Sequence, residues 1–373
     1  MAEVPKNTKR KPTAKKEFSL SDYKKQKGNE DVPDKPLRWL KLSPAFQKAT
    51  GLSGAAVGAV TIYRGFSNTG KSTALCETAV AAQKEENTLP IIINTEGNTN
   101  DNRLKMMGFD MSLPHIFIDN DYLLNNFGKK QDPKRTEASI EDLADCVRDF
   151  LYDQENGDLP YNLVFLIDSI GTLDCVRTIN AQEKNTTDNN MWNAGAYEKS
   201  FKYLLNNTIP SSRKITKSYT NTLVAVQKIW IDNMGAGVVK HKGGEAFYFG
   251  CRLGYHFGGI AAHSTSVVKA TSKNRDVAYG IDTKVSVFKN HIDGPLGGIS
   301  LEGKIMSMPH GFIFKEDLDE YKKKHILFFR NILGDDSLNP EEIGDKFEKN
   351  NDKIPDVDSF NEKMKANTNF DKE

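Results

Sequence analysis

The nine residues GFSNTGKST, which run from Gly65 to Thr73, constrain the fold more than any other part of this chain. They match the pattern G-x-x-x-x-G-K-S/T, a glycine-rich loop that binds the phosphates of a nucleotide. A β-branched and aromatic run, VTIY, precedes the loop, and the helix-forming residues ALCE follow it. This order of strand, loop and helix predicts an α/β fold with a parallel sheet. A glycine-rich turn with a chance lysine is the alternative, and it leaves both flanks unexplained.

Each position of the loop has a physical role in binding a nucleotide, which we expect to be ATP with Mg²⁺. The glycines let the backbone curl so that its N–H groups point at phosphate oxygens, and the next helix adds its positive N-terminal end. Lys71 brings an ammonium group to the β- and γ-phosphates, and the Ser72 hydroxyl is a hard oxygen ligand for Mg²⁺. The residues predicted to bind the nucleotide here are Gly65, Phe66, Ser67, Asn68, Thr69, Gly70, Lys71, Ser72 and Thr73.

Apolar strands and helical segments alternate after the loop. The predicted strands are Leu89–Gly97, His115–Asn120, Tyr161–Ser169 and Asn221–Gln227. The predicted helices are Lys71 to about Gln83, NRLKMMGFD, a helix with Ser139 as its N-cap, and one around Trp192–Leu205. Uninterrupted apolar strands are typical of a parallel sheet that is covered on both faces. A strand-rich stretch follows, and the charged segment EDLDEYKKKHILFFRNIL is predicted to be helical. The chain is therefore expected to have an α/β core with a mostly parallel central sheet.

Charge is unevenly distributed along the chain, although the formal net charge is only +1. Residues 1–29 hold nine Lys and Arg against three Asp and Glu, and residues 331–373 hold six Lys against twelve Asp and Glu. Such biased ends are typical of solvated, partly disordered segments. We predict a basic, flexible extension over residues 1–35, the α/β core over residues 36–314, and a charged helix with an acidic tail over residues 315–373.

Cysteine usage and hydropathy indicate a cytoplasmic protein without a membrane partner. The four cysteines, Cys76, Cys146, Cys175 and Cys251, lie far apart and form no C-x-x-C pair. This spacing argues against a zinc site or a disulfide framework and fits a reducing compartment. No apolar run reaches the length of a membrane span, and the lysine-rich N-terminus lacks the apolar segment of a signal peptide.

Three polar residues at strand ends are candidates for the chemistry. Asp168 follows the apolar run NLVFLI and is predicted to be the second anchor of Mg²⁺, with a turn-capping Asp as the alternative. Glu96 follows IIINT and is predicted to be the general base that orients the attacking water, with a surface Glu in a turn as the alternative. Gln227 ends the strand TLVAV, where its amide is predicted to bond the γ-phosphate and report its presence.

The order of these motifs resembles the RecA family of homologous recombinases, and within it the phage UvsX-type branch. The resemblance covers about residues 36–300 and rests on the glycine loop, Glu96, Asp168-Ser169, Gln227 and the later segment GGEAFYFG. It implies a RecA-like P-loop ATPase core that forms helical filaments on single-stranded DNA and exchanges strands with double-stranded DNA. The resemblance also implies two protein partners, a single-strand-binding protein and a loading mediator. If the chain is of phage origin, the expected location is the cytoplasm of the host.

The resemblance also implies two DNA-binding loops. The first would lie in Ala181–Gly195, with Met191 and Trp192 as wedge or stacking groups. For Trp192, inward packing at the start of the next helix is an equal alternative. The second would be a mobile segment over Trp230–Gly244, where glycines give mobility and basic side chains reach phosphates. Its predicted DNA-binding residues are Lys240, His241, Lys242, Gly243 and Gly244.

The strand KVSVFKNHIDGP resembles the family strand whose basic residues reach the ATP of the neighbouring subunit. Lys289 matches, and His291 stands where RecA itself has a second lysine. A neutral imidazole would stabilise the charge of the transition state less than lysine does at pH 7. Arg103 lies where relatives place a side chain that stacks on adenine, a task that suits a planar guanidinium.

These features favour an ATP-dependent strand-exchange recombinase over three alternatives. A hexameric replicative helicase with the same core usually has a helical N-terminal domain and an arginine finger, whereas here about 40 polar residues precede the core. A non-hydrolysing DNA-binding mediator would have lost Lys71, Glu96 or Asp168, and all three are present. A RecA-like signalling ATPase that acts on protein would not need the basic, glycine-rich second loop.

Overall fold

The structure is a computed structural model, and it describes residues 19–26, 32–97, 99–183, 191–232, 238–241, 243, 245–259, 265–273, 275–293 and 302–349. Among these residues, twelve strands form one large sheet. Two further strands, β1 (Trp39–Lys41) and β2 (Gly54–Ala56), pair with each other outside it. No helix in the described part of the chain combines the length and the apolar character that a bilayer crossing requires.

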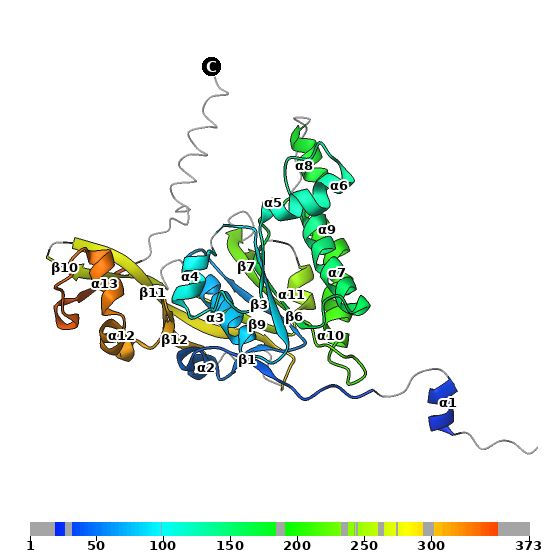
Figure 1. The fold of residues 1–373 in the computed structure, drawn as a ribbon, viewed down its shortest axis with the longest axis horizontal. Helices are drawn as coiled ribbons and strands as arrows, with labels where there is room; N and C mark the ends of the chain where they lie inside the picture. The colour runs from blue at the N-terminus through cyan, green and yellow to red at the C-terminus, as the bar shows by residue number, and fades with distance from the viewer. Residues whose placement is uncertain are drawn as a thin grey trace, which may run out of the picture.

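Six of the described strands run parallel to one another and form the part of the sheet that carries the candidate site (Figure 1). In spatial order they are β5 (Ile116–Ile118), β4 (Thr88–Asn94), β6 (Asn162–Ile170), β7 (Thr222–Asp232), β3 (Val60–Gly65) and β9 (Leu253–Phe257). Parallel strands bring their carboxyl ends to the same edge of a sheet. The residues that follow β3, β4 and β6 therefore meet at one edge, and they include the glycine loop, Glu96 and Asp168.

Helices cover both faces of these parallel strands, as their apolar sequences predict. The face called here the α3 face is covered by α3 (Lys71–Gln83), and the opposite α9 face is covered by α7 (Ile140–Asn156), α9 (Met191–Tyr203) and α11 (Ala246–Gly250) (Figure 1). Alternate strand residues pack on the two sides. Ile92 and Val224 belong to the apolar cluster on the α3 face, whereas Ile91 and Leu223 belong to the cluster on the α9 face.

The helix that Ser139 was predicted to cap begins as expected. The Ser139 hydroxyl accepts the backbone N–H of Asp142 at 3.2 Å, and the Asp142 carboxylate accepts the N–H of Ser139 at 2.8 Å. Arg135 pairs with the same buried carboxylate. The shorter helices are α1 (Leu20–Gln26), α2 (Pro44–Thr50), α4 (Asp101–Met106), α5 (Asn120–Leu123), α6 (Lys129–Gln131), α8 (Val176–Glu183) and α10 (Ile209–Ser211).

An antiparallel extension continues the sheet beyond β9. Its strands are β11 (Arg275–Asn290), β12 (Glu302–Met308), β13 (Gly311–Ile313), β10 (Ser266–Ser272) and β14 (Gly344–Lys349). The long strand β11 pairs with β9 through its C-terminal part and with β10 through its N-terminal part. It therefore joins the parallel strands to a separate apolar cluster, which includes Val268, Tyr279 and Phe329.

Two features of the C-terminal region were not predicted from the sequence. The charged helical segment is broken at His325 into α12 (Leu318–Lys324) and α13 (Ile326–Leu333). The strand β14 lies within the expected acidic tail, yet it pairs antiparallel with β10 over six residues, from Gly344 to Lys349. Lys322 is 5% exposed and binds the Ile343 carbonyl and the Asp345 carboxylate, which fixes α12 to β14. Residues 315–349 are therefore part of the folded structure.

The strand β7 is longer than the prediction of Asn221–Gln227. It continues to Asp232, and its end forms a hairpin with β8 (Val238–His241), in which Trp230 pairs with Lys240. Much of the expected mobile segment Trp230–Gly244 is therefore strand. Branched and aromatic side chains favour this extended conformation, and the residues from 228 to 231 read KIWI.

We predict that β14 stabilises the fold whereas the residues after it do not. A chain that ends at Asn339 loses the buried Ile343 and both Lys322 contacts, and should unfold with a free energy lower by at least about 3 kcal/mol. A chain that ends at Lys349 keeps every described contact and should unfold like the full chain. Urea denaturation of the three proteins measures this, and equal stability of all three would show that β14 contributes nothing.

Candidate functional site

The glycine loop joins β3 to α3 as the sequence predicts, since β3 ends at Gly65 and α3 begins at Lys71. Two glycines are required by the geometry. A Cβ atom at position 65 would lie 2.4 Å from the carbonyl oxygen of Phe257, and Gly70 has a φ of 98°, in the left-handed region. A side chain at either position would therefore hinder the path of the loop. The loop directs the start of α3 into a cavity.

The cavity has a volume of about 380 Å³ and is formed by residues from seven elements and loops. Its lining residues are Ser67, Asn68, Thr69, Gly70, Lys71, Ser72, Glu96, Arg103, Asp168, Val226, Lys228 and Ile281. Nine of these twelve were predicted as site residues. The other three, Val226 and Lys228 on β7 and Ile281 on β11, were not predicted.

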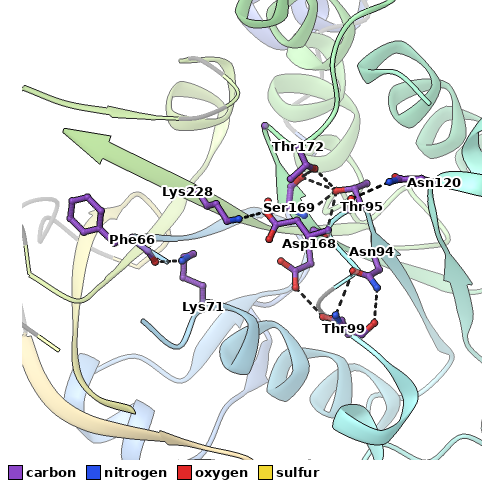
Figure 2. A network of polar contacts seen from close by, with 12 residues as sticks. Phe66, Lys71, Asn94, Thr95, Thr99, Asn120, Asp168, Ser169, Thr172 and Lys228 are labelled. Carbon is purple, nitrogen blue, oxygen red and sulfur yellow. Dashed lines mark hydrogen bonds and ion pairs between the residues drawn. The ribbon is translucent and has the colours of Figure 1, made fainter. Parts of the chain in front are cut away.

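Lys71 lies buried at the base of the cavity, where its ammonium group donates to the carbonyl oxygen of Phe66 (Figure 2). Burial and, after it, the nearby ammonium group of Lys228 lower the pKa of Lys71 to about 8. Two cations that face one cavity repel each other in this way. A phosphate that enters between them would relieve the repulsion and favour the charged form of Lys71.

Asp168 is a fully buried carboxylate at the end of β6, with an exposed fraction of 0%. Its Oδ2 accepts the Thr99 hydroxyl at 2.9 Å, while its Oδ1 accepts no hydrogen bond from the described residues. Burial raises the pKa of Asp168, whereas Thr99 and the neighbouring Ser72 hydroxyl lower it. A buried oxygen without a partner is costly, and a bound cation would supply one. The pair of Ser72 and Asp168 therefore fits Mg²⁺, which needs few protein ligands beside phosphate and water.

Glu96 follows β4 and is held next to Asp168. The backbone N–H groups of Thr95 and Glu96 both donate to the carbonyl oxygen of Asp168, at 2.8 Å and 3.2 Å. The Glu96 carboxylate accepts the Ser169 hydroxyl and forms an ion pair with Lys228, whose Nζ lies 3.0 Å from Oε1. The Glu96 side chain is only 7% exposed, so it is a carboxylate fixed inside the cavity and not a surface residue.

Hydrogen bonds between the loops that follow β4 and β6 fix these acidic groups (Figure 2). The Thr95 hydroxyl contacts the Thr172 hydroxyl at 2.6 Å and the carbonyl oxygen of Ser169 at 3.0 Å. Asn94 donates to the carbonyl oxygen of Thr99 at 2.6 Å, which holds the loop that carries Thr99 to Asp168. Sequence reasoning did not identify these residues. Their position directly after buried strands was the available signal.

Gln227 does not line the cavity, in contrast to the prediction. Side chains along a strand alternate between the two faces of the sheet. Ala225 belongs to the cluster on the α9 face, and Gln227, two residues later, therefore points to that face, where it is fully buried. Val226 and Lys228 point to the α3 face and line the cavity. The polar residue of β7 that reaches the site is therefore Lys228.

Arg103 lies on α4 and lines the cavity, as predicted for a residue near the nucleotide. Its guanidinium donates to the Thr73 hydroxyl at 3.1 Å, and this hydroxyl is also 2.7 Å from the hydroxyl of Ser307. Arg103 therefore contacts the first turn of α3. Stacking on adenine stays a prediction.

Lys289 and His291 lie away from the glycine loop of their own chain. Lys289 pairs with Gly254, and Gly254 pairs with Ile62, three residues before the end of β3 at Gly65. Three residues of strand correspond to about 10 Å. The Lys289 ammonium donates to the carbonyl oxygens of Tyr248 and Phe249 at the end of α11, and His291 is exposed.

Met191 and Trp192, the residues predicted to contact DNA in the first loop, lie in the first turn of α9. Trp192 begins α9 next to Met191 and packs partly against the α9-face cluster, with the Arg177 guanidinium 3.9 Å from its ring centroid. This matches the inward-packing alternative. A DNA contact for either residue stays a prediction.

In the second loop, Lys240 is exposed, Gly243 has a left-handed φ of 81°, and His241 stacks on Tyr248. Burial, with a smaller effect from Arg64, lowers the pKa of His241, which makes it a poor phosphate cation at pH 7. The predictions for Lys242 and Gly244 lie outside the described residues.

Comparison with known proteins does not identify the chain: no protein-family model matches it, and no curated protein matches it. The function therefore has to be argued from the site itself.

We predict that Asp168 weakens the fold while it serves the site. Its raised pKa means that the folded state disfavours the charged form, so removing the charge by Asp168→Asn should raise the free energy of unfolding near pH 7 by about 1 kcal/mol. The same variant should lose the Mg²⁺ dependence of ATP binding. Urea denaturation and calorimetric titration of ATP with and without Mg²⁺ measure both effects. A variant that is destabilised and still binds Mg²⁺-ATP normally would exclude the metal role.

Proposed function

We propose that this chain is an ATP-dependent DNA strand-exchange recombinase with a RecA-like fold, most similar to the UvsX-type branch, that forms filaments on single-stranded DNA. The observation that carries the proposal is the path of β7. This strand contributes Lys228 to the cavity and, one residue later, at Ile229, enters the hairpin that presents the exposed Lys240. One continuous strand thus connects the candidate nucleotide site to the hairpin that carries the exposed Lys240.

The cavity residues divide the work of ATP hydrolysis among them. Lys71 and the loop amides bind the phosphates, and Ser72 and Asp168 hold Mg²⁺, which when bound neutralises charge that develops on the phosphates. Glu96 accepts a proton from the attacking water, whose oxygen forms a bond to the γ-phosphorus. The bond from that phosphorus to the β-γ bridging oxygen breaks, and ADP leaves with the electron pair. Glu96 suits this task because it is held within the cavity by backbone and side-chain bonds.

Assembly of protomers is the second part of the proposal. Lys289 lies about 10 Å along the sheet from the loop of its own chain, and His291 lies farther away, just after β11, so neither acts there. The family resemblance has this strand contact the ATP of a neighbouring subunit, and this position on the sheet is compatible with such a role. In the filament, Lys289 would leave the carbonyl groups of α11 for the partner's γ-phosphate.

The partners and location follow from the same proposal. Single-stranded DNA would bind along the filament, and double-stranded DNA would supply the second strand for exchange. A single-strand-binding protein and a loading mediator would act before assembly, in the cytoplasm. No observation on the described residues favours the ring helicase or the mediator, and both become outcomes of the test.

Electron microscopy of the protein with single-stranded DNA and a non-hydrolysable ATP analogue tests the proposal. We expect helical filaments whose length follows that of the DNA, and short or absent filaments with ADP. Closed rings of six subunits would instead indicate the helicase. DNA coating that does not depend on the nucleotide would indicate the mediator.

We predict that Lys240 binds DNA through phosphate charge alone. Lys240→Ala should reduce the slope of log affinity against log salt for single-stranded DNA by about 0.7, the value for one lost phosphate contact. The change should be equal on DNA of different sequence. Lys217→Ala is the matched control, because Lys217 is also exposed but precedes the start of β7, whereas β8 pairs with the end of this strand. Fluorescence anisotropy over a range of salt concentrations measures the slope, and an unchanged slope for Lys240→Ala would mean that the hairpin does not face DNA.

A further inference from the structure

We propose that Lys228 senses the γ-phosphate of ATP, and that its ion pair with Glu96 restrains the base until ATP takes the lysine away. The inference deepens the proposed function and rests on it, since it requires ATP in the cavity and Glu96 as the base. It assigns to Lys228 the reporting role that the sequence suggested for Gln227.

The first argument is the contact itself. The Lys228 ammonium lies 3.0 Å from Oε1 of Glu96, and the Ser169 hydroxyl donates to the same oxygen. Two donors therefore already occupy Oε1, and an attacking water molecule would have to compete with both of them for this oxygen. In this arrangement Glu96 is therefore a restrained base.

The second argument is the reach of Lys228. Its backbone pairs in register with Gly65, the first residue of the glycine loop, and its side chain lines the cavity together with Lys71. The side chain is 32% exposed, against 7% for Glu96, so the lysine is the partner with room to move. A γ-phosphate in the cavity offers more negative charge than one carboxylate, and it would draw the ammonium group from Glu96.

The third argument is the connection to the hairpin. Ile229, the residue after Lys228, pairs with His241, and Trp230 pairs with Lys240. A shift of Lys228 toward the phosphate therefore acts on the first residue pair of the hairpin. Gln227 cannot begin this chain of contacts, because it is buried on the opposite face of the sheet.

The cycle that follows couples chemistry to DNA binding. ATP binds, Lys228 moves to the γ-phosphate, and Glu96 becomes able to accept the proton of the attacking water. After cleavage, phosphate leaves with the charge that held Lys228, and the lysine returns to Glu96. The hairpin thus has one arrangement with ATP and another with ADP, which is what release from DNA after hydrolysis requires.

The test compares the binding of a non-hydrolysable ATP analogue and of ADP, each with Mg²⁺ and without DNA. Lys228→Met keeps the length of the side chain and removes its charge. It should weaken binding of the ATP analogue at least ~10-fold, the usual scale for a lost charge-assisted bond, and leave ADP binding unchanged. The control is Lys202→Met, since Lys202 forms a surface ion pair with Glu198 at 2.9 Å, and it should change neither. Equal effects on both nucleotides, or none, would overturn the inference.

A double-mutant cycle examines the competition between carboxylate and phosphate. Glu96→Gln releases Lys228, so it should tighten binding of the ATP analogue in the wild-type background and do so much less in the Lys228→Met background. An equal gain in both backgrounds would mean that Glu96 only repels the phosphate and that Lys228 takes no part. Glu96→Gln should also reduce ATP turnover by at least ~10²-fold, the usual scale for a general base.

A third measurement uses the wild-type protein, so its result does not depend on whether a variant folds. Amine labelling followed by mass spectrometry should show Lys228 protected by the ATP analogue and not by ADP, while labelling of Lys202 stays constant. Protection by both nucleotides, or by neither, would overturn the inference. If the wild-type protein binds no ATP analogue, the proposed function and the inference fail together. If it binds ATP but Lys228 is indifferent, only the inference fails.

Discussion

The parallel register of four strands is the constraint on which the rest of the site depends. It brings the ends of β3, β4, β6 and β7 to one edge, so that the glycine loop, the proposed base Glu96, the proposed metal ligand Asp168 and Lys228 meet there although up to 163 residues separate them in the chain. The apolar runs that build these strands are buried on both faces, and the polar groups that line the cavity lie at or near their carboxyl ends. Charges that would be costly in the core lie at that edge, and two of them, on Glu96 and Lys228, compensate each other as an ion pair.

Successive side chains of β7 point to opposite faces of the sheet, so neighbouring residues of this strand have different surroundings. Val226 and Lys228 face the cavity, and Gln227 faces the helices on the other side. The same strand continues into the hairpin with Lys240, so a change at the phosphate has a short covalent path to a basic surface. The proposed enzyme thus uses a rigid sheet to hold its chemistry and a single extended strand to transmit the state of its nucleotide.

Much of the candidate ATP site could be located from the sequence because its patterns are local. The glycine loop, the start of α3 at Lys71, and the strand ends at Glu96 and Asp168 each follow from a short pattern with one physical meaning. Lys228 could not be found in this way, since a lysine after a strand is common and its partner Glu96 lies on another strand. The strand β14 could not be predicted because its sequence is highly charged. An edge strand that pairs on one side only can keep such polar side chains. The same limit applies to Lys289, whose proposed target would be another chain.

Strand exchange between a labelled single strand and a duplex tests the central claim most directly. A fluorescent donor and acceptor on the two strands of the duplex report their separation. The account predicts exchange with a homologous duplex in the presence of ATP and Mg²⁺, and none with ADP or with a duplex of unrelated sequence. Separation of the duplex strands without regard to homology, or ATP- and DNA-binding without any exchange, would contradict it.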